Sequence, residues 1–194
     1  MIANRFRQKI ADVFFGSQKT PLDPHQEAYY KCLEASRRQE FYTEFEVADT
    51  FDGRFDMLCL VMSIYMQKLS QDTEKTKQFS QNLFDAMFKD IDLTLREMGA
   101  GDLGVGKRVK VMSESFMGRL TKYSQSVENK DATMLADTLS RNLYRKAGSV
   151  KEDSNITQFV FNFYEQMTIL EAEYLISEDF NMNDFIATCL GSQR

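Results

Sequence analysis

No proline follows Pro24, and this absence constrains the fold class more than any motif does. Proline breaks helices when it stands in their interior, so a long chain without it favours helical structure. Alternating strand patterns and Asn-Gly hairpin turns are also absent. The segments that remain repeat apolar residues every three to four positions, as amphipathic helices do. The sequence therefore predicts an all-α fold, a single globular helical domain of about six to eight helices.

Residues that usually carry chemistry are scarce. His25 is the only histidine, and the three cysteines, Cys32, Cys59 and Cys189, are scattered without CxxC spacing. A nucleophile needs a positioned base, and structural zinc needs closely spaced thiolate or imidazole ligands. We therefore expect no enzyme, no cofactor, no metal site and no small-molecule substrate. The scattered cysteines also favour a reducing compartment.

Long apolar runs and an excess of positive charge are missing as well. The longest apolar run, Met57–Met66, is interrupted by Ser63, whereas about 20 residues are needed to cross a bilayer. The net charge of −5 opposes broad binding to nucleic-acid phosphates, so we expect no DNA partner.

One group of carboxylates is a candidate for cation binding. Asp49, Asp52 and Asp56 surround Gly53-Arg54 just before the longest apolar run. Acidic residues at the start of a helix also cap it and complement its dipole. This second interpretation explains the group without a metal.

What is present divides into an N-terminal amphipathic arm, residues 1–20, and a helical domain, residues 21–194. Residues 2–15 place Arg5, Arg7 and Lys9 opposite part of an apolar face. Such a segment packs on its own domain, frays, or binds a membrane surface. The last possibility supports an alternative function, that of a peripheral membrane or lipid-binding helical protein.

Periodicity and capping residues place the helices of the domain. Phe55–Leu69 is apolar almost all round, as a central buried helix is. Its methionines either fill the core or supply an adaptable apolar surface for partners. The other helices are expected from Asp23-Pro24 to about Arg38, over Thr73–Met98, Lys107–Val127 and Asp131–Lys146, from Asp153 or Ser154 with Leu170 and Tyr174 inward, and over Met182–Cys189.

Four glycines between the two longest helical segments predict a sharp turn. The stretch also imitates a dinucleotide fingerprint and a P-loop, but Arg108 stands where the P-loop needs Ser or Thr. Both motifs require a strand before the glycines, and the preceding segment has a helical period, so we reject both. We expect Gly106 to need a positive φ. The residues assigned to the structural turn are Arg96, Gly99, Gly101, Asp102, Gly104 and Gly106.

The helix after the turn has a basic face that is unusual in an acidic protein. Lys107, Arg108, Lys110, Arg119 and Lys122 lie opposite the stripe that runs from Val109 to Tyr123. A solvated helix face and a docking face both explain this pattern. We expect Arg96 and Asp102 to lock the turn internally, and the basic residues to face outward toward a partner.

Two stretches together resemble the ubiquinol–cytochrome c chaperone family. The likeness covers roughly residues 29–145 and fades beyond Lys151, and it departs from the family at Ala48, where proline is usual, and at Met117, where an aromatic is expected. The residues that carry it are Phe41-Tyr42, Val47–Asp56, Phe84–Asp92, Leu95–Gly99, Gly101-Asp102, Val105–Val109, Phe116-x-Gly118-Arg119 and Asn142-Leu143-Tyr144.

The resemblance implies a non-enzymatic assembly factor for the respiratory ubiquinol–cytochrome c reductase. Its implied client is newly made cytochrome b, with the ribosome or the inner-membrane surface as further contacts. Because the chain starts close to the family region, it resembles bacterial members, which implies the bacterial cytoplasm at the inner face of the inner membrane, or the matrix side in a eukaryote. The residues predicted to meet the partner are Asp52, Arg54, Glu97, Lys107, Arg108, Lys110, Arg119 and Lys122.

Overall fold

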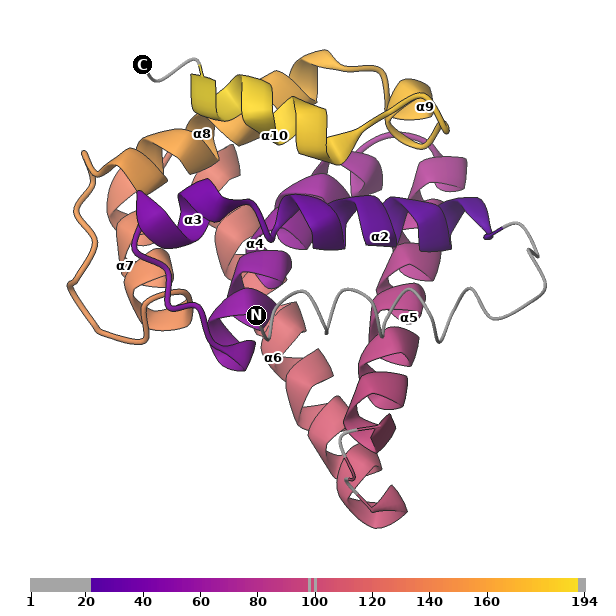
Figure 1. The fold of residues 1–194 in the computed structure, drawn as a ribbon. Coiled ribbons are helices and arrows are strands. Elements are labelled where there is room, and N and C mark those ends of the chain that lie inside the picture. Colours follow the sequence, from indigo (N-terminus) through magenta and orange to yellow (C-terminus); the bar gives the residue numbers. More distant parts are fainter. Residues whose placement is uncertain (1–21, 98, 100, 192–194) are drawn as a thin grey trace.

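Helices form all the regular structure in a computed structural model that describes residues 22–97, 99 and 101–191. These ranges contain nine helices and no strand, so the predicted all-α class is confirmed. Seven of the nine are ten residues or longer. The predicted arm, residues 1–20, lies outside the described residues. In chain order (Figure 1) the helices are α2 (Pro24–Ala35), α3 (Gln39–Thr43), α4 (Phe51–Ser70), α5 (Glu74–Glu97), α6 (Asp102–Glu128), α7 (Ala132–Asn142), α8 (Asn155–Ile169), α9 (Ala172–Leu175) and α10 (Met182–Gly191).

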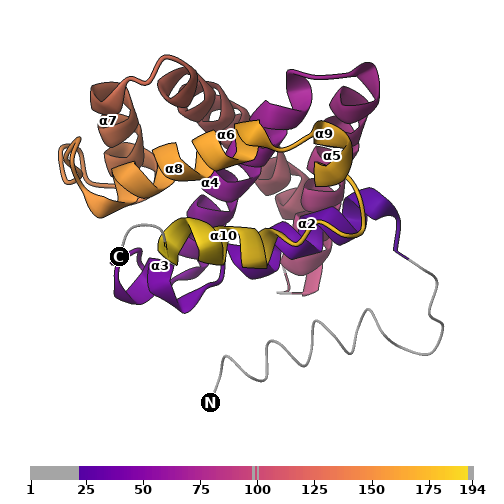
Figure 2. The same cartoon turned by 90° about the horizontal axis from the view of Figure 1, so that it is seen from above.

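Helix α4 is the centre of the molecule, as its apolar sequence predicts. It begins after Thr50, whose hydroxyl accepts a hydrogen bond from the Gly53 backbone N–H at 3.1 Å and so caps the helix. Helices α2, α5, α6 and α8 all pack against it (Figures 1 and 2). A helix that is apolar all round needs neighbours all round, and this requirement sets the arrangement of the others.

Helices α5 and α6 form a hairpin whose closed end projects from the body (Figure 1). The stripe predicted on α6 faces inward, with Phe116 and Tyr123 fully buried. Phe84 and Phe88 of α5 meet the ring of Phe116 at centroid distances of 5.6 and 6.0 Å. Aromatic contacts therefore join the two helices within the body, and the closed end extends beyond them.

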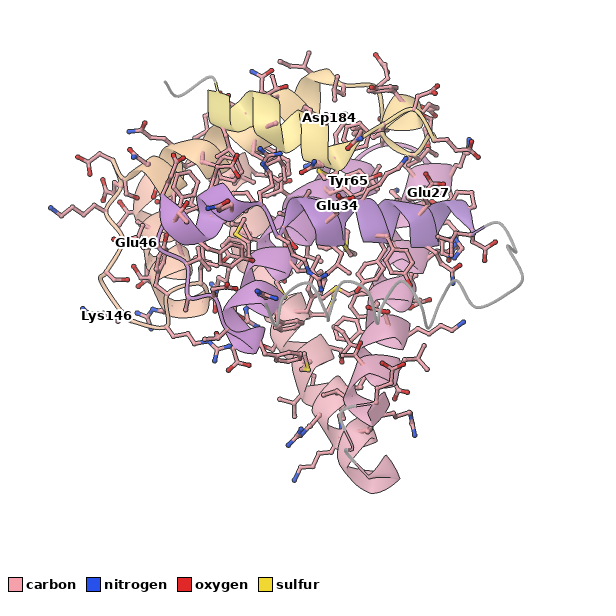
Figure 3. The ribbon with its side chains drawn as sticks, in the orientation of Figure 1. Glu27, Glu34, Glu46, Tyr65, Lys146 and Asp184 are labelled. Carbon is pink, nitrogen blue, oxygen red and sulfur yellow. The ribbon has the colours of Figure 1, made fainter. Side chains whose placement is uncertain are left out.

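The last three helices cover one end of the body, above α2 and α4 in Figure 1 and in front of them in Figure 2. Tyr65 of α4 points into this layer (Figure 3) and donates its hydroxyl to the Leu175 carbonyl at 2.5 Å. The prediction that Tyr174 faces inward is wrong. Helix α8 ends at Ile169 because Leu170 is extended, so Tyr174 falls in the separate helix α9, where its side chain is exposed.

The methionines of α4 fill the core. Met57 and Met62 are fully buried and Met66 nearly so. Among the described methionine side chains only Met117 is exposed. The methionine content therefore provides core packing rather than a broad adaptable surface.

None of the helices in the described ranges combines the length and the apolar character that a bilayer span requires.

Candidate functional site

The closed end of the hairpin, here called the apex, is a short turn between Glu97 and Asp102. Gly99 lies at φ +84°, a conformation that favours glycine. Because α5 leads directly into the glycines, the strand that both phosphate motifs require is not there. The apex is therefore a helix–helix connection and not a nucleotide-binding loop.

The turn is shorter than the glycine spacing predicts. Gly104 and Gly106 lie inside α6, and a Cβ added to either would meet nothing within 4 Å. The expected positive φ at Gly106 is wrong, because the α6 backbone is already helical from Asp102. Arg96 at the end of α5 donates to Asp92 of the same helix at 2.6 Å, and both side chains are partly exposed. Glu97 beside it is exposed.

Four basic residues of α6 face solvent as predicted: Lys107, Arg108, Lys110 and Lys122. Lys110 approaches Glu114 one turn on at 3.9 Å. Within the described part of the chain the other three have no ion pair. Surface charges of this kind contribute little to stability, which leaves them available for a partner.

Arg119 belongs to a second group in the body, which we call the base cluster: Asp52, Asp56, Arg119 and Arg145. The carboxylate of Asp56, on the second turn of α4, is only 1% exposed. Arg119 of α6 donates to its Oδ1 at 2.8 Å, and Arg145, after α7, donates to its Oδ2 at 2.9 Å. Arg145 also reaches Asp52 at 2.7 Å. Three segments that are distant in sequence therefore meet at one buried carboxylate.

Burial and pairing act in opposite directions on Asp56. Loss of water raises its pKa, while the guanidinium groups of Arg145 and Arg119 lower it. Burial dominates, so the pKa of Asp56 lies above its ordinary value. Arg119 also lies over the Phe55 ring at 5.7 Å, a cation–π contact that helps to hold the guanidinium in place. A buried charge with fixed partners ties elements together and leaves little of itself for recognition.

The outward orientation predicted for Arg119 is therefore wrong, since its side chain is 11% exposed and paired with Asp56. Asp52, also predicted to meet a partner, is exposed but bound to Arg145. Arg54 is bound to Asp49 at 2.6 Å, and this pairing lowers the pKa of Asp49. None of these three lies at the apex. About 11 residues of helix, or roughly 16 Å, separate Arg119 from Arg108, and Asp52 and Arg54 lie at the start of α4.

The acidic group around Gly53 does not form a cation site. Asp49 and Asp52 each pair with an arginine, and Asp56 pairs with two. Among the described residues no group of three potential metal ligands gathers. The arginines that neutralise these carboxylates come from elsewhere in the chain, which sequence spacing does not reveal.

A third polar contact joins α2 to α5. The hydroxyl of Tyr29, which is buried, donates to Asp90 Oδ2 at 2.7 Å. Burial raises the pKa of Asp90 above its ordinary range, although the hydrogen bond from Tyr29 opposes that shift. This contact holds α2 against the half of α5 that is nearer the apex. Closer still to the apex, Leu95 of α5 and Val105 of α6 are buried.

Arg145 is the member of the base cluster that the sequence reasoning missed. It follows Asn142-Leu143-Tyr144, a motif assigned only to family likeness, and it adopts a positive φ of 53°. Tyr144 holds the segment by donating to the Phe45 carbonyl at 2.6 Å. The signal in the sequence was a basic residue beyond the end of α7, but its acidic partners lie in α4.

Comparison with known proteins identifies the family of the chain. The model of the family described as ubiquinol-cytochrome C chaperone matches residues 43–180. That range contains both the hairpin and the base cluster.

Two relatives extend the comparison. The mouse protein "Ubiquinol-cytochrome c reductase complex assembly factor 1" is 21% identical over 108 residues, 56% of this chain and 37% of the mouse protein. The chain thus corresponds to little more than a third of that relative. The crystal structure of the Cbp3 homolog from Brucella abortus superposes with a TM-score of 0.67 at 28% identity, covering 93% of this chain and 96% of that one.

Proposed function

Because the chain belongs to the ubiquinol-cytochrome C chaperone family, we propose that it is an assembly factor for the ubiquinol–cytochrome c reductase. Its proposed client is newly made cytochrome b, which it binds during maturation. The role is non-enzymatic, as membership of a chaperone family implies. Its proposed place is the cytoplasmic side of a bacterial inner membrane, or the matrix side in a eukaryote.

The family match over residues 43–180 is the observation that carries this proposal. The named relative is an assembly factor of the same complex, which supports a subunit of that complex as the client. The base cluster and the hairpin both lie inside the matched range. Holding a client demands a firm body and an accessible surface, and these two regions meet those demands.

We assign client contact to two exposed charges near the apex, Glu97 and Arg108, together with Leu93 of α5, which is 39% exposed. Leu93 is an apolar residue that is partly exposed to water in the isolated chain, and covering it contributes favourable burial. The charges on either side set the register of the bound client. Arg119, Asp52 and Arg54 are assigned to holding the body together.

The test is crosslinking in cells followed by affinity capture and measurement of cytochrome b. The wild-type chain should enrich cytochrome b, and a Glu97→Arg/Arg108→Glu variant should lose most of the enrichment while melting at the same temperature. Lys75→Glu at the other end of α5 is the matched control, because Lys75 is exposed as well. Failure of the wild-type chain to enrich cytochrome b would refute this client.

A further inference from the structure

Charge is distributed very unevenly along the chain. Residues 101–151, which include α6 and α7, hold ten Lys and Arg against five Asp and Glu. Residues 152–191, which include α8, α9 and α10, hold eight Asp and Glu and no Lys or Arg. Although the whole chain is acidic, residues 101–151 carry a net positive charge and residues 152–191 contain no basic residue.

The fold separates these two segments in space. Helices α8, α9 and α10 lie at the end of the molecule opposite the hairpin apex (Figure 1). Figure 3 shows Asp184 of α10 at that end and Glu34 on α2, which packs beneath α10; both lie away from the apex. The molecule is therefore electrically polar, with its acidic end remote from the exposed part of α6.

The basic part of α6 also carries exposed apolar side chains. Lys107, Lys110, Val111, Met117 and Lys122 lie within roughly 140° of one another at 100° per residue, and we call them the α6 outer face. Val111 is 57% exposed and Met117 49% exposed. The inward residues Phe116 and Tyr123 lie on the other side of the helix. Glu114 is the acid on this face, and it is already close to Lys110.

From these observations we infer that the α6 outer face docks the protein on an anionic membrane surface. Lysines attract anionic headgroups, and each contributes favourably within a Debye length of the surface. Val111 and Met117 supply the apolar groups that a purely electrostatic site lacks. The acidic end is repelled by the same surface, so the polarity selects one orientation.

Two features favour lipid over other anionic partners. Proteins that bind single-stranded nucleic acid add aromatic side chains on which bases stack, and the exposed side chains described on α6 include none. The α6 outer face lies along one side of a single helix of the hairpin, which suits a planar surface. The inference rests on the proposed function in one respect: a client that belongs to a membrane complex would be bound at the membrane.

The experiment is co-sedimentation of the full chain with vesicles of phosphatidylcholine, with and without about one-third phosphatidylglycerol. Wild-type protein should bind the anionic vesicles, bind neutral vesicles at least tenfold more weakly, and dissociate as salt rises. Lys107→Gln/Lys110→Gln/Lys122→Gln should lose at least tenfold in binding. The matched control is Lys75→Gln/Lys77→Gln/Lys89→Gln, which removes the same charge from exposed positions of α5 and should bind within twofold of wild type.

A second variant separates the α6 outer face from the N-terminal segment. Arg5→Gln/Arg7→Gln/Lys9→Gln should retain at least half of the binding. If this variant loses binding while the α6 variant retains it, or if the α5 control loses as much as the α6 variant, the inference is wrong. It is also wrong if the α6 variant binds vesicles normally but loses cytochrome b, because the face is then a protein contact. Client capture is not needed for the vesicle measurement, so each proposal fails separately.

Discussion

The two ends of α6 carry arginines that look alike in sequence and differ in role. Arg108 near the apex is exposed and has no ion pair among the described residues, whereas Arg119 in the body is nearly buried against Asp56. Both lie on a helix whose inward stripe was predicted correctly. The difference comes from what stands beside the helix: α4 faces Arg119, and no helix in the described ranges faces Arg108. The neighbouring helices therefore divide the basic face of α6 into two parts. One part forms ion pairs within the body, and the other remains exposed to solvent.

The largest difference in stability between the two parts of α6 should appear when one arginine of the base cluster is removed. Arg119→Ala leaves the carboxylate of Asp56 buried with only Arg145, and we expect the free energy of unfolding to fall by about 3 kcal/mol. Arg108→Ala should change it by less than about 0.5 kcal/mol. Urea denaturation of both variants measures the two values.

A double variant shows whether the loss comes from the uncompensated charge. In an Asp56→Asn background the further change Arg119→Ala should cost much less, because no buried carboxylate is left without its partner. Equal costs in both backgrounds would show that Arg119 acts by packing over Phe55 instead.

Glycine positions give the second contrast, again between the body and the apex. A Cβ on Gly53 would lie 2.0 Å from the Ala48 carbonyl oxygen, a backbone atom that cannot move independently. Gly53→Ala should destabilise by about 2 kcal/mol. Gly106→Ala should stabilise by about 0.5–1 kcal/mol, because alanine favours helix and open space surrounds the position. Thermal melting of the two variants should give shifts of opposite sign.

The third contrast concerns pH and Asp90, in the half of α5 that is nearer the apex. Burial raises the pKa of Asp90 in the folded chain, so this group favours folding below its unfolded pKa, and that contribution is lost as pH rises through the folded pKa. Asp90→Asn keeps an acceptor for Tyr29 and has no charge to bury. It should be more stable than wild type at pH 7, and the difference should shrink toward pH 4. A difference that grows on acidification would mean that Asp90 is stabilised as the anion.

The smallest effect is expected at the exposed lysines. Lys107→Gln and Lys122→Gln should each leave the free energy of unfolding within about 0.5 kcal/mol of wild type. We expect these substitutions to weaken vesicle binding without lowering the free energy of unfolding. A large loss of stability from either change would place these lysines in the structural part of α6.

Several elements followed from local sequence. The absence of proline after Pro24, the 3.6-residue periodicity and the cap at Asp131, whose side chain accepts from the Met134 N–H at 2.8 Å, predicted the fold class and most helices. These features act within one or two turns of chain, so they can be recognised without knowing the neighbours. The end of α8 was missed because the apolar period runs on through Leu170 to Tyr174 although the backbone becomes extended.

The sequence by itself determined that the chain is helical, that α4 is central and that a glycine turn joins two long amphipathic helices. Only the tertiary structure decided which charges are structural. The base cluster needs Asp56 from α4, Arg119 from α6 and Arg145 from beyond α7, and no periodicity links these positions. The periodicity of a sequence shows in which direction a side chain points around the axis of its helix. Burial and ion pairing depend on which other helix lies in that direction.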